Sequence, residues 1–301
     1  MINKKNVLDS GNPMTWIGCQ EDIDDRVTEA PIKGMQATLN HKIMNDLEGS
    51  ELPALWHWLY FLPSFQTSKS GADGHVERGG FFPPISLPCR MWAGGIVEFI
   101  SPLKVGDNIK KISTITNIEH KVGKKGELVF VTVNHHIYQG KQLAIRERQD
   151  LVYRGITSPD TAKKNLIFSK EKAQWSVVIN PTELMLFRYS ALTFNAHRIH
   201  YDKDYAIGVE NYEGLVVQGP LIVTLLLDTF FNIHPNVKIE KIKFRGVRPL
   251  FVTLPFWLEG CWVGQDIDSP EGNSKQKKIL LWAKDVDGAV AMQAEVYVAL
   301  E

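Results

Sequence analysis

The chain repeats one arrangement of segments in its two halves, and this repeat restricts the possible folds more than any other feature. In each half a Phe precedes a Pro-Leu pair, which begins at Pro102 in the first half and at Pro249 in the second. Long runs with strand-like alternation follow, and a glycine interrupts them at Gly140 and at Gly288. The proline and the glycine are 38 positions apart in the first half and 39 in the second. We therefore expect two tandem copies of one structural unit.

Both copies are predicted to end in a β-hairpin. Alternating apolar and polar residues flank Gln139-Gly140 in the first copy and Asp287-Gly288 in the second. An Asp-Gly pair between alternating runs favours a two-residue turn, because both central residues of that turn need positive φ.

Each copy also contains a segment upstream of its hairpin that favours a buried helix. In the second copy this segment spans residues 219–231 and is apolar almost all round. Pro220 stands at its expected first position, where a missing N–H costs nothing. The expected counterpart in the first copy is the aromatic-rich segment 52–61. One buried helix and several long antiparallel strands, present twice, predict a double hot-dog. In this α+β fold, each of two tandem units wraps an antiparallel sheet round a central helix.

The two expected units are residues 1–153 and residues 175–301. The polar segment 154–174 between them contains a Ser-Pro pair and several lysines, and it is typical of a surface linker. Residues 62–90 are rich in Gly and Pro and show no periodicity. A stretch of that length favours a functional loop or lid.

Composition narrows the class of partner. The 301 residues include 34 Lys and Arg and 34 Asp and Glu, so the formal net charge is zero. Duplex-binding proteins gain affinity from surplus positive charge, so we expect no nucleic-acid partner. No apolar stretch reaches the ~18–20 residues of a membrane span, and the N-terminal segment lacks the apolar core of a secretory signal. The three cysteines show no metal-ligand spacing, so we expect reduced thiols in a cytoplasmic protein without a metal site.

The densest group of polar residues, 195–200, directly follows a predicted helix. Asn180 is the expected N-cap of that helix, which should end near Thr193. Asn195 and His200 are five positions apart, a spacing that does not stack on one helical face. The two side chains can converge only if the chain turns between them.

The segment from Asn195 to His200, Asn-Ala-His-Arg-Ile-His, resembles the active-site motif of MaoC-like hydratases and dehydratases, Asp-x-Asn-Pro-x-His. His200 falls on the histidine of the motif, whereas Asn195 replaces its aspartate and Arg198 its proline. The chain also contains RMWAGG at 90–95 and GELVFVTV at 126–133. With these segments it is similar to the branch of type-2 hydroxyacyl-thioester dehydratases and mesaconyl-CoA or itaconyl-CoA hydratases, from about residue 52 onward.

This resemblance implies a hydro-lyase that acts on an enoyl-CoA or 3-hydroxyacyl-CoA thioester. His200 is the expected proton-transfer group, because histidine titrates near neutral pH and can serve as base and acid. Asn195 is expected to hold the water through its amide oxygen, since an amide does not accept a proton as a carboxylate does. The backbone N–H of Gly219, at the start of the buried helix, is the expected oxyanion donor.

Other residues are expected to contact the substrate. They are His197, Arg198, Arg90, Tyr189 and Gln218. Because an arginine fork suits a carboxylate, Arg198 or Arg90 is expected to neutralise the free carboxylate of a dicarboxylic acyl group. The alternative role of His197 and Arg198, weighed equally, is only to fix the loop. Candidates for binding the phosphates of coenzyme A are Lys243, Arg245 and Arg248.

The substrate that the resemblance favours is mesaconyl-CoA or itaconyl-CoA, converted to citramalyl-CoA as in itaconate degradation. The second copy is expected to carry the active site, and the first copy, which lacks the motif, to supply the acyl and CoA groove. We expect no metal or redox cofactor, since coenzyme A enters as part of the small-molecule substrate, and a homodimer is left open. One alternative is a 3-hydroxyacyl-carrier-protein dehydratase of fatty-acid synthesis. The other is a non-catalytic thioester-binding hot-dog protein.

Overall fold

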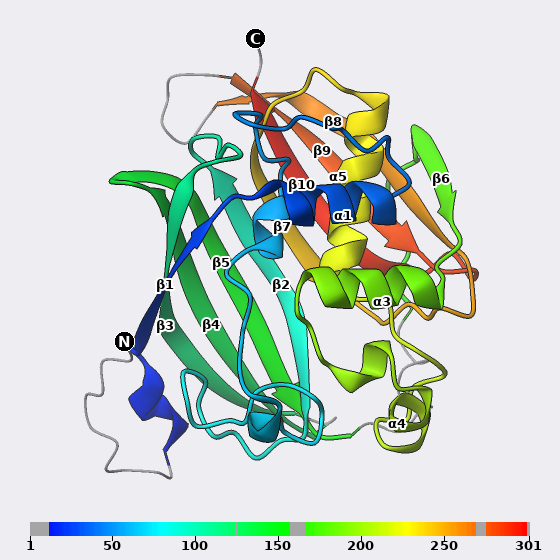
Figure 1. Ribbon diagram of the computed structural model, residues 1–301. Coiled ribbons are helices and arrows are strands. Elements are labelled where there is room, and N and C mark those ends of the chain that lie inside the picture. The colour runs from blue at the N-terminus through cyan, green and yellow to red at the C-terminus, as the bar shows by residue number, and fades with distance from the viewer. Residues whose placement is uncertain (1–11, 124–125, 157–165, 269–274, 300–301) are drawn as a thin grey trace.

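One large sheet dominates the computed structural model, which describes residues 12–123, 126–156, 166–268 and 275–299 (Figure 1). Ten antiparallel strands follow the order β1-β3-β4-β5-β2-β7-β10-β9-β8-β6. In this order the strands span Gln20–Arg26, Asn108–Gly123, Gly126–Gln139, Gln142–Arg154, Cys89–Phe99, Ile239–Gly246, Val290–Ala299, Lys275–Lys284, Phe256–Asp268 and Trp175–Ile179.

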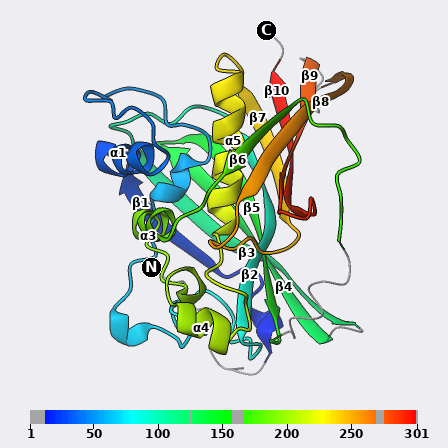
Figure 2. The same ribbon diagram turned by 90° about the vertical axis from the view of Figure 1, so that its right-hand side faces the viewer.

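The main helices lie together on one side of this sheet, as two perpendicular views show (Figure 1, Figure 2). The helices are α1 (Glu29–Thr38), α3 (Glu183–Leu192), α4 (Lys203–Gly208) and α5 (Gly219–Ile233). Short 3₁₀ turns are η1 (Pro13–Trp16), η2 (Trp56–Leu59), η3 (Thr67–Lys69) and η4 (Arg198–His200). Among the described residues, no helix combines the length and the apolar character that crossing a membrane requires.

The two halves of the chain join where β2 pairs with β7. Their register runs from Gly94 opposite Arg245 to Glu98 opposite Lys241. A Cβ on Gly94 would lie 2.5 Å from the carbonyl oxygen of Phe244, so the strands approach this closely because the residue lacks a side chain. The sheet therefore continues from one half into the other, and the predicted double hot-dog is confirmed.

The predicted helix of the second half is confirmed as α5. Its buried residues include Leu221, Val223 and Leu226, each at most 1% exposed, and they join the main core cluster. Burying one such side chain contributes about 1.5–3 kcal/mol, which fixes the helix against the sheet. Pro220 occupies the second helical position instead of the first, where its missing N–H is equally harmless.

The prediction of a helix over residues 52–61 is wrong. Only the 3₁₀ turn η2 forms there, held by i→i+3 bonds such as Trp58 N–H to the Leu55 carbonyl at 3.1 Å. Leu55 and Phe61 have φ of 69° and 56°, and these left-handed residues end the helical path at both sides of the turn. The segment is nevertheless buried. Its apolar pattern therefore predicts the burial of these residues correctly but not their backbone conformation.

Both hairpins are confirmed, but only one has the predicted two-residue turn. In the first, Gln139 pairs with Gln142 across Gly140 and Lys141. In the second, β9 ends at Lys284 and β10 begins at Val290, so the turn is longer. The side chain of Asp285 accepts the backbone N–H groups of Asp287 and Ala289 there, which stabilises the larger loop.

The helix before the motif is confirmed as α3, and it ends within one residue of Thr193. Its N-cap is Thr182, whose hydroxyl accepts the Met185 N–H at 3.1 Å, so the expected cap at Asn180 is wrong by two residues. Part of the expected linker, residues 157–165, lies outside the described residues. Residues 62–88 form a long connection with one 3₁₀ turn, and the division of the chain into domains stays a prediction.

Candidate active site

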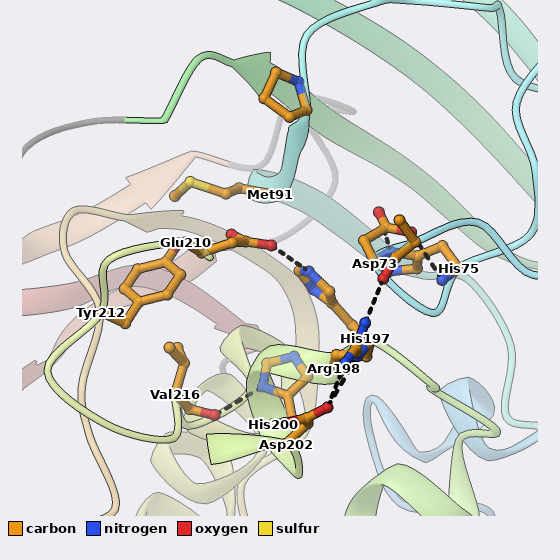
Figure 3. Close-up of polar contacts among 12 residues, drawn as sticks. Asp73, His75, Met91, His197, Arg198, His200, Asp202, Glu210, Tyr212 and Val216 are labelled. Carbon is orange, nitrogen blue, oxygen red and sulfur yellow. Dashed lines mark hydrogen bonds and ion pairs between the residues drawn. The ribbon is translucent and has the colours of Figure 1, made fainter. Parts of the chain in front are cut away.

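His200 ends the 3₁₀ turn η4 and is 7% exposed. Its Nδ1 lies 2.7 Å from the carbonyl oxygen of Val216, so Nδ1 carries the proton and donates it (Figure 3). Nε2 bonds to no described residue and is not sealed from solvent. The tautomer therefore presents a bare nitrogen, which is the form that accepts a proton.

Electrostatics keep His200 uncharged. Burial, followed by the charge of His197, lowers the pKa of His200 to about 3, against the opposing effect of its bond to the Val216 carbonyl. At neutral pH the imidazole is a neutral base.

His197 is buried beside His200, and the two rings meet edge to face with centroids 5.4 Å apart. Its Nε2 lies 3.3 Å from Oε1 of Glu210, a carboxylate that also hydrogen bonds with the Tyr205 hydroxyl and the Cys89 thiol. This buried network fixes the ring of His197 in place.

Asn195 shapes the turn that carries the histidines. After α3 the chain takes a left-handed conformation at Phe194, with φ of 49°, and Asn195 N–H donates to the Ser190 carbonyl at 2.8 Å. Oδ1 of Asn195 then accepts the His197 N–H at 3.1 Å. The chain does turn between Asn195 and His200, while the convergence of their side chains and the water contact of Asn195 stay predictions.

Arg198 is bound within the protein. Its guanidinium donates to Asp202 Oδ2 at 2.7 and 3.0 Å and to the Ala72 carbonyl at 3.1 Å, and it lies 4.2 Å from the centre of the Tyr205 ring. Of the two roles considered for Arg198, these contacts favour fixing the loop.

The loop of residues 71–75, from the first half, docks on this motif. Arg198 N–H donates to the Asp73 carbonyl at 2.9 Å. Gly74 has φ of 88°, and a Cβ there would overlap the carbonyl oxygen of Ala196. This loop brings first-half side chains into contact with the motif, while the expected division, with the active site in the second half and the groove from the first, stays a prediction.

Asp73 and His75 are those side chains. Oδ2 of Asp73 lies 3.0 Å from Nδ1 of His75, and the His75 ring stacks on His197 with centroids 4.3 Å apart. Burial, followed by the charge of Arg90, lowers the pKa of His75 to about 3. Burial alone would raise the pKa of Asp73, but the bonds and charge of His75 outweigh it and hold this pKa well below its usual range. The pair is a carboxylate bonded to a neutral imidazole.

Sequence reasoning missed Asp73, His75 and Glu210. One signal was available, since Asp-Gly-His at 73–75 lies inside the segment expected to be a functional loop. Ligand atoms of Asp73, His75 and His197 lie within 4.8 Å of one another, close enough to hold a divalent cation.

Gly219 lies close to His200 in the fold, because the extended segment just before α5 hydrogen bonds to His200. Val216, which accepts the His200 proton, donates its own N–H to the Ile199 carbonyl at 3.0 Å. Three residues later Gly219 begins α5, and its N–H bonds to no described residue. Three residues span at most about 10 Å, so this free donor lies near the imidazole.

Tyr189 and Gln218 have core positions. Tyr189 is 1% exposed and faces Thr224 of α5. Gln218 is fully buried, and its amide nitrogen donates to the Leu186 carbonyl and the Ser190 hydroxyl, which joins α3 to the start of α5. The contacts shown for both residues are structural, and their expected contact with a substrate stays a prediction.

Arg90 remains available for a ligand. Arg90 is the second residue of β2, and its guanidinium lies 5.5 Å from the centre of the Phe82 ring. It forms no ion pair with the acidic residues that the structure describes. Its charge is close enough to lower the pKa of His75. A cation therefore stands beside the site without a permanent counter-ion.

The residues expected to bind coenzyme A are separate from the histidines. Lys243 and Arg245 are exposed on β7, while the alternating Ile242 and Phe244 face the core. They line a groove of about 600 Å³ that includes none of the histidine cluster. Arg248 instead pairs with Asp285 at 2.8 Å. Phosphate binding by these residues stays a prediction.

Comparisons with known proteins agree with the motif. A family profile described as hydroxyacyl-thioester dehydratase type 2 matches residues 55–252. The chain is 40% identical to mesaconyl-C(4)-CoA hydratase of Chloroflexus aurantiacus, over 96% of this chain and 99% of that one. It is 31% identical to the mitochondrial hydroxyacyl-thioester dehydratase type 2 of Schizosaccharomyces pombe, over 82% and 95%. A solved MaoC-like dehydratase shares the fold, with a TM-score of 0.68 at 13% identity over 95% and 98% of the two chains.

Proposed function

The chain belongs to the hydroxyacyl-thioester dehydratase type 2 family and is a hydro-lyase, and we propose that its substrate is a short branched dicarboxylic enoyl-CoA, mesaconyl-CoA or itaconyl-CoA, which it hydrates to citramalyl-CoA. The observation that carries this proposal is the 40% identity to mesaconyl-C(4)-CoA hydratase over nearly the full length of both chains. Adding water changes no net oxidation state, so the reaction calls for no redox group, and coenzyme A arrives with the substrate.

His200 moves the proton in this proposal. As the water oxygen bonds to Cβ, the broken O–H bond leaves its proton on Nε2 of His200. The electron pair of the double bond moves onto the thioester oxygen, and the resulting enolate takes the proton back from His200 at Cα. The free N–H of Gly219 donates to the enolate oxygen, and one such donor is worth about 2.7–4 kcal/mol in a transition state.

The low pKa of His200 predicts an unusual pH profile. A histidine of ordinary pKa loses its basic form as the pH falls through 6.5, whereas His200, with a pKa of about 3, keeps it. We expect kcat/KM for hydration to stay within about twofold between pH 8 and pH 5, measured by loss of enoyl absorbance in buffers of constant ionic strength. An acidic limb centred near 6.5 would contradict the role of His200 as a pre-formed neutral base.

Arg90 is proposed to recognise the free carboxylate of the substrate. We expect Arg90→Gln to lower kcat/KM for mesaconyl-CoA by about 10–100-fold, as loss of a charged hydrogen bond does, and to leave crotonyl-CoA, which lacks the carboxylate, within about twofold. Arg146→Gln is the matched control, because Arg146 pairs with Glu98 at 2.7 Å on the exposed side of β5. An equal loss on both substrates would assign Arg90 to the fold or to coenzyme A.

A substrate panel tests the function itself. The unmodified protein is incubated with mesaconyl-CoA, itaconyl-CoA, crotonyl-CoA and a 3-hydroxyacyl-carrier protein, and product formation is followed by mass. We expect the highest kcat/KM with a dicarboxylic acyl-CoA. Preference for the carrier-protein substrate would establish the fatty-acid-synthesis alternative, and turnover of none would favour the thioester-binding alternative.

A cytoplasmic location and a homodimer are carried as parts of the proposal, although the fission-yeast relative is named as mitochondrial.

A further inference from the structure

The attacking water has one identified hydrogen-bond acceptor in this site, and a second acceptor would help to orient it. A water molecule has two hydrogens, and Nε2 of His200 accepts one of them. The motif of related hydratases has a carboxylate where this chain has Asn195, and Oδ1 of Asn195 already accepts the backbone N–H of His197. A second acceptor aimed at the water would fix the direction of its attacking lone pair.

We propose that His75, held by Asp73, is this second acceptor, so that the first half of the chain supplies a catalytic residue to the site of the second half. The inference rests on the proposed hydration. One hydrogen of the water is transferred to His200 as the oxygen bonds to Cβ. The other hydrogen stays on the oxygen and is held by Nε2 of His75, which remains neutral throughout.

The tautomer of His75 suits this role. Nδ1 lies 3.0 Å from Oδ2 of Asp73, and a carboxylate held ionised can only accept, so Nδ1 carries the proton. Nε2 is then bare, as it is in His200, whose Nδ1 donates to the Val216 carbonyl. Two imidazoles from different halves of the chain therefore present the same acceptor nitrogen.

The rings of His75 and His200 lie in one cluster, because each packs against the ring of His197. His75 and His200 both contact the ring of His197, at centroid distances of 4.3 Å and 5.4 Å (Figure 3). The His75 side chain is 19% exposed against 5% for His197, so His75 is the more open to an entering molecule. Nε2 of His197 is moreover occupied by Glu210. His75 is thus the imidazole that meets both requirements, an open nitrogen and a fixed tautomer.

The docking of the loop keeps His75 there. Arg198 donates to the carbonyls of Asp73 and Ala72, and Gly74 packs against the backbone of Ala196. These contacts fix residues 72–74 against the motif, and the Gly71 N–H donates to the His75 carbonyl at 2.7 Å, which closes the loop around the pair. A rigidly placed acceptor is what orientation of a small nucleophile needs.

The decisive variant is Asp73→Asn. An asparagine amide can donate to Nδ1, which moves the proton of His75 to Nε2 and removes the acceptor without removing the ring. We expect kcat to fall on the order of 10²–10³-fold with KM within about twofold, since wrong-tautomer substitutions in catalytic carboxylate–histidine pairs cost up to ~10⁴. The ¹⁵N shifts of labelled histidine should show protonation moving from Nδ1 to Nε2.

Two further variants separate catalysis from structure. His75→Phe retains a ring against His197 and should lose as much kcat as Asp73→Asn, and the double variant should lose no more than either single one, because the two residues act as a unit. Asp228→Asn is the matched control, since Asp228 pairs with His41 at the same 3.0 Å outside the cluster, and it should leave kcat unchanged.

Each remaining outcome would overturn the inference. Variants of Asp73 and His75 that keep kcat within about threefold would show that the water needs no second acceptor. Additive losses would show two separate structural roles. Loss of the unmodified protein's activity with EDTA, restored by a divalent cation, would show that Asp73, His75 and His197 hold a metal instead. Failure of the proposed function is distinguishable, because then the unmodified protein would hydrate none of the enoyl-CoA substrates.

Discussion

Replacing His200 with alanine is expected to lower kcat for enoyl-CoA hydration by about 10²–10⁴-fold while KM stays within about threefold, because the imidazole acts on the water and on Cα and not on the body of the thioester. In the proposed mechanism its Nε2 accepts the proton, since its Nδ1 already donates to the Val216 carbonyl. The measurement is steady-state hydration of mesaconyl-CoA and crotonyl-CoA, followed by enoyl absorbance.

A control must separate this loss of catalysis from the loss of stability that removal of a histidine ring causes. His135 is suitable, because it is half-buried and hydrogen bonds to Ser113 and Gln149 on neighbouring strands. His135→Ala should lower the melting temperature without a comparable loss of kcat in the folded fraction. If His200→Ala hydrated either substrate at more than a tenth of the original rate, the assigned mechanism would be wrong.

The second large effect is expected at Gly74. A Cβ at this position would overlap the carbonyl oxygen of Ala196, and φ of 88° is itself unfavourable for alanine. Gly74→Ala should therefore push the loop of residues 71–75 away from the motif. Displacing a reacting group by about 1 Å can cost 10²-fold in rate, so we expect kcat/KM to fall at least about 100-fold.

Gly79→Ala isolates the steric part of this effect. Gly79 lies in the same long connection with φ of 96°, but the nearest atom to its Cβ would be Pro84 at an ordinary 3.9 Å. Both substitutions place an alanine in the left-handed conformation, which costs about 1–2 kcal/mol. Only Gly74→Ala also creates a steric clash, with the carbonyl oxygen of Ala196. Equal activity of the two variants, compared by kcat/KM and thermal melting, would show that the docking of the loop does not matter for turnover.

The sequence predicted the features that depend on local pattern. The apolar run from Gly219 to Phe231 forms α5, the alternating runs form strands, and the chain turns within the motif. Residues 52–61 carry an equally apolar pattern without forming a helix, because tertiary contacts hold Leu55 and Phe61 at positive φ. Periodicity reports which residues are buried, but long-range packing decides the backbone conformation of a short aromatic segment.

The parts of the site that sequence reasoning missed depend on distant contacts. Asp73 and Arg198 are far apart in the chain, and no local rule joins Asp-Gly-His in a loop to a motif in the other half. Residue type alone left Arg198 with two roles, binding a carboxylate of the substrate or fixing the loop, and in the folded protein Asp202, four residues on, binds it. The chemistry of the motif could be predicted from residue types, but its partners could not, because the fold alone brings them together.

The junction of β2 with β7 has a consequence for how the enzyme tolerates change. The loop that carries Asp73 and His75 leads into β2, and the segment that carries His200 leads to α5 and then to β7. The positions of the His75 and His200 rings therefore depend on this short row of paired strand residues as well as on the contacts between the loop and the motif. Small shifts along that row would misalign the chemistry long before they unfolded the molecule, so natural variation should be narrower at this junction than at the outer strands of either half.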